Sequence, residues 1–122
     1  MGNSPADPNR LKAFRRGYVS EYLAALYLLA RGYRIHAIRY RTKLGEIDIV
    51  ARRGDLVAFV EVKARRDVDS AVFAVTGTAE RRIRAASDIW LSRQPDAHRL
   101  SARYDIVAVR PWRLPTHIED AF

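Results

Sequence analysis

The stretch GEIDIVARRGDLVAFVEVKAR, residues 45–65, decides the fold because it reads as two β-strands joined by a tight turn. Both halves are rich in branched apolar residues, and the pair Gly54 and Asp55 between them is typical of a two-residue hairpin turn. A turn at that pair sets the register of the whole hairpin. In this register Asp48 lies opposite Glu61.

One face of the hairpin is predicted to be apolar and the other polar, because side chains alternate along a strand. The apolar face would carry Ile47, Ile49, Val60 and Val62, and the polar face Glu46, Asp48, Glu61 and Lys63. The simplest interpretation is a solvated polar face. However, Asp48 and Glu61 would be like charges with Cβ atoms about 5 Å apart, which destabilises a sheet unless a cation lies between them. Two such carboxylates can share a Mg²⁺ ion, and this metal site is the interpretation we favour.

Outside the hairpin, hydrophobic periodicity predicts a single α/β domain over residues 1–122, since the chain is too short for two domains. A long helix would run from Pro8 to just before Gly32. The members of its apolar stripe are Leu11, Phe14, Tyr18, Tyr22, Ala25 and Leu29. Strands are predicted over residues 33–41, 46–52, 56–63 and 101–110, with a second helix over 78–93. The expected architecture is therefore a mixed sheet flanked by helices, in the order α, β, β, β, α, β, with a flexible N-terminus (1–7) and an irregular tail (111–122).

The charge of the chain favours a polyanionic partner. Lys and Arg number 22 against 14 Asp and Glu, for a formal net charge of +8, which suits nucleic acid before an acidic membrane surface. Most of this charge is arginine, which binds phosphate well, although a GC-rich genome also explains that bias. There is no cysteine and no apolar run long enough to span a bilayer, so we expect a cytoplasmic protein without a membrane partner.

Glu21 is unusual because it interrupts the apolar seam of the first predicted helix. A buried carboxylate that lacks a partner costs several kcal/mol. Two partners are open at this stage: an arginine in a structural salt bridge, which is the commoner outcome, or a cation shared with the hairpin acids.

The residues on the hairpin resemble a known superfamily. Asp48 followed by Glu61, Val62 and Lys63, within the element order above, is similar to the core of the PD-(D/E)xK, or restriction-endonuclease-like, nucleases. More narrowly, GEIDIVA followed by FVEVKAR resembles the YraN-like bacterial family, which comprises predicted nucleases distantly similar to archaeal Holliday junction resolvases. The likeness extends to EYLAALYLLARGYRI from Glu21, to RYDIVAV and to the closing HIEDAF.

The resemblance implies a restriction-endonuclease-like αβββαβ core and assigns roles to its residues. Asp48 and Glu61 would bind Mg²⁺ or Mn²⁺ together with the carbonyl of Val62. Lys63 would orient or activate water and balance charge on the phosphate, and Glu21 would be a helix acid of the same catalytic site. Phosphodiester hydrolysis requires a Lewis acid and a cation for the developing charge, so these residue types suit that chemistry.

Five arginines near the predicted site are candidate nucleic-acid contacts. They are Arg65 and Arg66 after Lys63, and Arg81, Arg82 and Arg84 at the start of the second helix. The second group could replace the lysine that is usual in the family where this chain has Ala79. For both groups a merely charged, solvated surface is the alternative.

The sequence as a whole predicts a nuclease that hydrolyses phosphodiester bonds in DNA, with DNA favoured over RNA. A Mg²⁺-dependent endonuclease is the favoured class, and branched or structured DNA is a candidate substrate. The alternative is a non-catalytic nucleic-acid-binding module or adaptor on the same fold. A homodimer stays open, because junction-cutting enzymes of this fold are dimers, but no exposed apolar stripe in the sequence identifies an interface.

Overall fold

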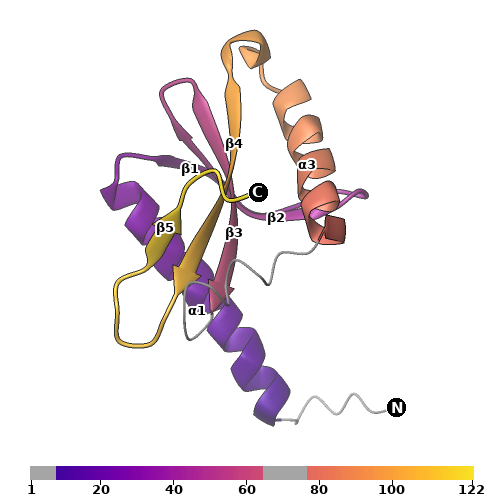
Figure 1. Cartoon of the computed structure of the whole chain (residues 1–122). Helices are drawn as coiled ribbons and strands as arrows, with labels where there is room; N and C mark the ends of the chain where they lie inside the picture. The colour runs from indigo at the N-terminus through magenta and orange to yellow at the C-terminus, as the bar shows by residue number, and fades with distance from the viewer. Residues whose placement is uncertain (1–7, 65–76) are drawn as a thin grey trace.

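A computed structural model of the chain describes residues 8–64 and 77–122, with side chains in the first helix from Tyr18 onward (Figure 1). Its elements are α1 (Pro8–Ala30), β1 (Arg34–Arg41), β2 (Glu46–Arg53), β3 (Leu56–Ala64), α3 (Gly77–Ser92), the 3-10 turn η1 (Ala97–Arg99), β4 (Ser101–Val109) and β5 (Thr116–Ile118). The predicted order of two helices and four strands is confirmed, and β5 is an additional strand. None of the helices in the described ranges is both long and apolar enough to cross a membrane.

The strands form one mixed sheet in the order β1-β2-β3-β4-β5. The β1–β2, β2–β3 and β4–β5 pairs are antiparallel, whereas β3 and β4 are parallel from Leu56↔Ser101 to Ala64↔Val109. A parallel pair requires a long crossover, and α3 lies in the connection between these two strands. The expectation of a mixed α/β sheet is therefore confirmed.

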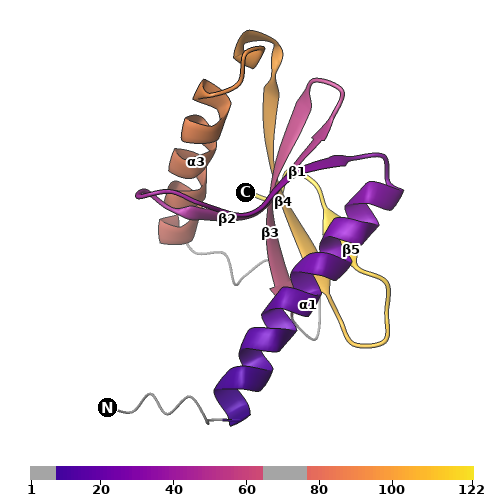
Figure 2. The ribbon, with the colours of Figure 1, turned by 180° about the vertical axis from the view of Figure 1, so that it is seen from behind.

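The helices lie on opposite faces of the sheet, α1 on one and α3 on the other (Figures 1 and 2). The α1 side buries Ala24, Ala25, Leu28, Tyr33, Ile49, Ala51, Ala58, Val60, Val107 and Val109. The α3 side buries Ile47, Val50, Val57, Phe59, Ile83, Ala86 and Trp90. Both faces of β2 and β3 are thus covered, which explains why these strands read as nearly continuous apolar runs.

Among the side chains that the structure describes, the predicted apolar stripe of α1 was wrong at two positions, and the side chains of Leu11 and Phe14 lie outside that part. Tyr22 and Leu29 are 60% and 51% exposed, while Ala24 and Leu28 are fully buried against the sheet. Apolar residues occupy both sides of this helix, so periodicity alone could not tell which side packs on the sheet.

The tail was also expected to be irregular over 111–122, and this prediction was wrong for Thr116–Ile118. These residues form β5 and pair with β4 at Ile106↔Ile118. A three-residue strand carries no local periodicity, and its formation depends on the edge of β4 that it covers. The predicted flexible N-terminus, residues 1–7, lies outside the described residues.

The predicted hairpin register is confirmed from Arg53↔Leu56 to Ile49↔Val60, around a turn in which Gly54 has a φ of 63°. The regular pairing stops there, before the expected pair of Asp48 and Glu61. Beyond this point β2 continues alongside β1, and their joined ends extend away from β3 toward α3 (Figure 1). Ile47 consequently packs on the α3 side, so the prediction that it shares a face with Ile49 was wrong.

Candidate functional site

The acidic side chains predicted to form a site come from three elements. Glu21 lies on α1, Asp48 on β2 and Glu61 on β3. The negative charge of Asp48 raises the pKa of Glu21, and the charge of Glu61 raises that of Asp48, so these charges act on one another. The divergence of β2 from β3 makes room for this arrangement in an otherwise paired sheet.

Asp48 and Glu61 form the centre of the site. Asp48 Oδ2 accepts a hydrogen bond of 2.8 Å from the backbone N–H of Val62, across the point where the strands separate. Hydrogen bonding with the Glu61 carboxyl group also acts to raise the pKa of Asp48. Burial, followed by the charge of Glu61, raises the pKa of Asp48 from 3.8 to about 7, although the Val62 N–H opposes this shift. The surroundings of Asp48 therefore disfavour its charged form.

Lys63 places a cation beside this pair. Its Nζ lies 3.3 Å from Glu61 Oε1, as expected for residues two apart on one face of a strand. Both side chains are largely shielded, with 22% and 16% of their surface exposed. The positive charge of Lys63 acts to lower the pKa of Asp48, but burial and Glu61 outweigh it.

Glu21 has an arginine partner, which is the first of the two options that the sequence left open. Arg39 Nε donates a hydrogen bond of 2.6 Å to Glu21 Oε1, and the Arg39 guanidinium lies 3.6 Å from the centre of the Tyr18 ring. Burial raises the pKa of Glu21, the bond from Arg39 opposes that shift, and the charge of Asp48 adds to it.

Sequence reasoning did not identify Arg39 as this partner. No local pattern identifies it, because Arg39 comes near Asp48 only through the β1–β2 pairing, in which Ile38↔Ile49 and Tyr40↔Ile47 lie on either side of Asp48. Arg39 also has a φ of 57°, an uncommon conformation for a residue with a side chain. The regular alternation of β1 breaks at this position, where Arg39 and Tyr40 are both half-buried.

The donor set of the site suits a hard divalent cation. Within residues 8–64 and 77–122, no group of three or more His, Cys, Asp or Glu residues is arranged to hold a metal ion. Mg²⁺, however, is commonly bound through only one or two carboxylates and keeps several waters. Asp48 and Glu61 with the Val62 carbonyl satisfy that requirement in residue type. Besides burial, which is the largest cause, the charge of Glu61 raises the pKa of Asp48 more than the charge of Lys63 lowers it, so these residues fit Mg²⁺ or Mn²⁺.

The arginines of α3 that were predicted to contact phosphate bond mainly to residues other than the acids of the site. Arg81, Arg82 and Arg84 are exposed on α3. Arg81 bonds to Thr78 at 3.3 Å, while Arg84 pairs with Glu80 and lies over the Tyr104 ring. These contacts leave the arginines on the surface of α3 and do not join them to the acidic site. Arg65 and Arg66 lie outside the described residues.

A second buried acid, Asp105, has a structural role. Arg103 donates two hydrogen bonds to it, of 2.8 and 2.7 Å, and His117 Nε2 lies 2.7 Å from Oδ2. Burial alone would raise the pKa of Asp105, but the bonds to His117 and Arg103 lower it to about 2. Because Arg31 donates to His117 Nδ1, His117 carries its hydrogen on Nε2 and donates to Asp105. Asp105 is fully satisfied inside the protein.

Comparison with known proteins gives a consistent family match. The model of the family described as "Uncharacterised protein family UPF0102" matches residues 20–109. A UPF0102 protein of Rhizobium meliloti (strain 1021) is 71% identical over 95% of both chains. Another from Sinorhizobium medicae (strain WSM419) is 68% identical over 96% of both, and one from Rhizobium etli (strain CIAT 652) is 63% identical over 100% of both. The matched range contains the acidic site.

Proposed function

We propose that this chain, which belongs to the uncharacterised protein family UPF0102, is a metal-dependent nuclease that hydrolyses phosphodiester bonds in DNA. The observation that carries the proposal is the arrangement of Asp48, Glu61 and Lys63. The half-buried Asp48 carboxyl group has its pKa raised by its surroundings and by the charge of Glu61, and the Lys63 Nζ lies 3.3 Å from Glu61 Oε1. Such a combination is unfavourable for stability alone, and perturbed acids of this kind cluster at functional sites.

The proposed class is a restriction-endonuclease-like nuclease of the YraN-like type. The resemblance around GEIDIVA and FVEVKAR supports it, as does the element order α, β, β, β, α, β. The net charge of +8 supports a nucleic-acid substrate, and the exposed arginines of α3 are proposed phosphate contacts.

Each residue of the site has a proposed task. Asp48 and Glu61 hold Mg²⁺ or Mn²⁺ with the Val62 carbonyl, and a bound ion of this kind polarises phosphate and lowers the pKa of water. Lys63 orients the attacking water and stabilises negative charge that develops on the phosphate. Glu21 is a positioning residue: fixed by Arg39, it adds negative charge close to Asp48 and so favours a cation there.

The test is cleavage of labelled single-stranded, duplex and four-way-junction DNA in the presence of Mg²⁺ or Mn²⁺. We expect metal-dependent cutting that falls by about 100-fold or more in Asp48→Asn, Glu61→Gln and Lys63→Ala, because each removes a group that acts on the transition state. Asp88→Asn is the matched control, since Asp88 is an exposed acid on α3. It should cut like the parent.

Two results contradict the proposal. One is no cutting of any substrate by folded protein, and the other is equal cutting by the parent and all three variants. Salt-sensitive DNA binding without cutting, unchanged by Glu61→Gln, would favour the non-catalytic binding module. Faster cutting of the matching RNA substrates would change the substrate class and leave the chemistry in place.

A further inference from the structure

The side of α1 that faces away from the sheet carries several large apolar side chains. They are Val19, Tyr22, Leu23, Leu26 and Leu29, each between 45% and 62% exposed. Their spacing of three or four residues places them along one face of the helix. The sheet side, in contrast, is built mainly from small residues such as Ala24 and Ala25. The helix is thus apolar on both sides, and the elements described here cover only one of them.

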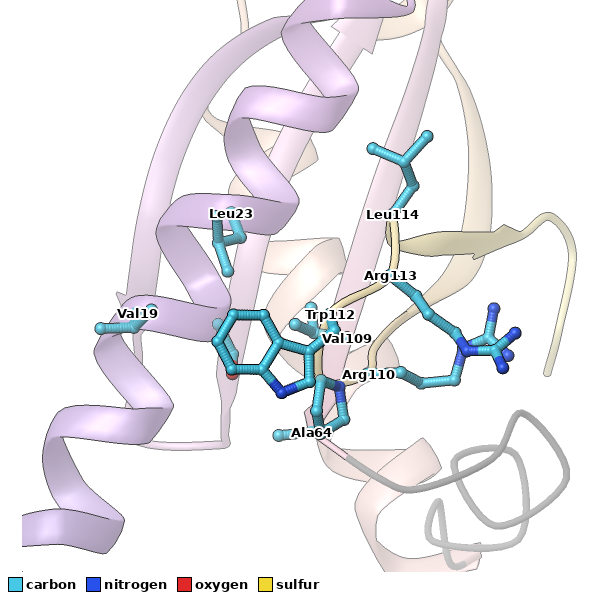
Figure 3. Close-up of a pocket in the computed structure, with 10 residues that line it drawn as sticks. Val19, Leu23, Ala64, Val109, Arg110, Trp112, Arg113 and Leu114 are labelled. Atoms are coloured by element: carbon cyan, nitrogen blue, oxygen red, sulfur yellow. The ribbon is translucent and has the colours of Figure 1, made fainter.

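This apolar surface continues onto the segment that follows β4. Trp112 is fully exposed and Leu114 is 79% exposed. A groove of about 820 Å³ lies between that segment and α1, with Val19 and Leu23 on one wall and Trp112 and Leu114 on the other (Figure 3). We call the seven exposed apolar residues of α1 and this segment the α1 surface.

We propose that the α1 surface is the interface through which two copies of this chain form a dimer. Seven large apolar side chains at these exposures present on the order of 1,000 Å². That area is larger than the largest exposed apolar patch of a typical monomeric protein, which is about 300–600 Å². It matches the roughly 800 Å² that each partner contributes to a stable complex. The sequence alone indicated no such interface, because two of these residues, Tyr22 and Leu29, were assigned to the stripe that packs on the sheet.

The shape of the surface favours a second copy over an unrelated partner. It carries both a projection, the exposed indole of Trp112, and a hollow, the groove beside it. A two-fold dimer brings identical patches together, so that each Trp112 can enter the groove of the other copy. Tryptophan and tyrosine are also the residue types enriched at the centres of interfaces.

The distribution of charge also favours this surface as the dimer interface. Each copy has a formal net charge of +8, so two copies repel each other over most of their surfaces. The seven residues of the α1 surface are uncharged, and the arginines that line the groove, Arg110 and Arg113, belong to the same segment as Trp112. Contact through these uncharged residues therefore brings the two copies together with the least electrostatic repulsion between them.

The groove borders the acidic site. Ser20 and Ala64 line it, and they are the chain neighbours of Glu21 and Lys63. A second copy bound there therefore lies at the edge of each site. The dimer does not depend on the proposed nuclease function, because association is measured without substrate.

The test is sedimentation velocity of the full chain from about 1 to 200 µM, a range that brackets ordinary dimer affinities. We expect the parent to associate into a species of twice 14.0 kDa. Leu26→Glu and Trp112→Ala should weaken this association by about 10-fold or more, since buried apolar contacts and a large aromatic side chain are lost. Leu44→Glu is the matched control, because Leu44 is 56% exposed in the β1–β2 turn, outside the α1 surface. It should leave association unchanged.

Tryptophan emission provides a second measurement. Trp90 is 6% exposed and Trp112 is fully exposed, so dilution of a dimer should shift the emission of the parent to the red, and Trp112→Phe should lose that shift. Circular dichroism verifies that the variants fold. A parent that stays monomeric throughout overturns the proposal and indicates that another occupant covers the surface. A dimer that Leu26→Glu leaves intact overturns it as well.

Discussion

At the scale of single residues, the central feature is a pair of acids held closer than stability alone would favour. The pKa of Asp48 is raised to about 7 by burial and by Glu61. Above that pH Asp48 is ionised beside Glu61, whose nearest cation is Lys63 at 3.3 Å. Groups kept in an unfavourable state inside a folded protein are usually retained for function, and here a divalent cation would relieve the repulsion.

This reasoning predicts opposite effects of one substitution with and without metal. At pH 8, Asp48→Asn should stabilise the metal-free protein by on the order of 1 kcal/mol, because the buried charge is removed while the amide oxygen can still accept the Val62 N–H. The same change should abolish the stabilisation of the parent by Mg²⁺. Urea denaturation with and without Mg²⁺ measures both effects.

Asp88→Asn is again the control, and should alter neither quantity. If Asp48→Asn lowers the stability of the metal-free protein and retains the Mg²⁺ effect, the acids form a structural pair and not a metal site.

At the scale of elements, the start of α3 is held against the β1–β2 turn. Thr42 closes this turn through hydrogen bonds with Gly45, whose carbonyl accepts from the Thr42 hydroxyl at 2.9 Å. A Cβ at position 45 would lie only 2.5 Å from the carbonyl oxygen of Arg82 on α3. The backbones of Gly45 and Arg82 are therefore in direct contact, and this contact fixes the position of the α3 arginines relative to β2.

Gly45→Ala should consequently destabilise the fold by about 1–3 kcal/mol, since the added methyl group meets backbone that cannot move aside freely. Gly77→Ala is a suitable comparison, because a Cβ there meets only the end of the Arg81 side chain at an ordinary 3.6 Å. It should be neutral or slightly stabilising at the start of a helix. Equal chemical denaturation curves for the two variants would contradict the close contact.

At the scale of the whole molecule, the Asp105 network joins distant parts of the chain. Through Asp105 it connects Tyr33 and Arg31 near the end of α1 with β4 and β5, by way of Arg103 and His117. The backbone N–H of Asp120 also donates to Asp105, so the C-terminal segment is fixed to the centre of the sheet.

This network predicts the response of the fold to acid. The pKa of Asp105 is about 2 in the folded protein, against 3.8 for an unperturbed aspartate, so its contribution of about 2 kcal/mol is complete above pH 4 and is lost as pH falls from 4 to 2. Asp105→Asn should remove that pH dependence. It should also destabilise the protein at neutral pH by about 3–5 kcal/mol, because Arg103 loses its buried partner.

Urea unfolding between pH 2 and 7 provides the measurement. Asp96→Asn is the comparison: hydrogen bonding to Arg52 lowers the pKa of Asp96 to about 2 as well, but that acid is partly exposed. An acid transition unchanged in Asp105→Asn would contradict the proposed role of the network.

The parts of the fold that follow from short-range pattern were predictable. Alternation and turn chemistry act over a few residues, so the hairpin register through Ile49↔Val60 and the element order could be read directly. The meeting of Asp48 and Glu61 followed from that register, although the contact forms between side chains where the backbone pairing has stopped.

The sequence by itself determined the strands, the helices and the acids that one hairpin brings together, because each depends on neighbours along the chain. Only the tertiary structure decided that Arg39 binds Glu21, that His117 binds Asp105, that β5 forms and that α1 turns Tyr22 and Leu29 outward. The physical reason is the same in every case. These features depend on surfaces and partners supplied by segments far apart in sequence, and no local periodicity records which of them will meet.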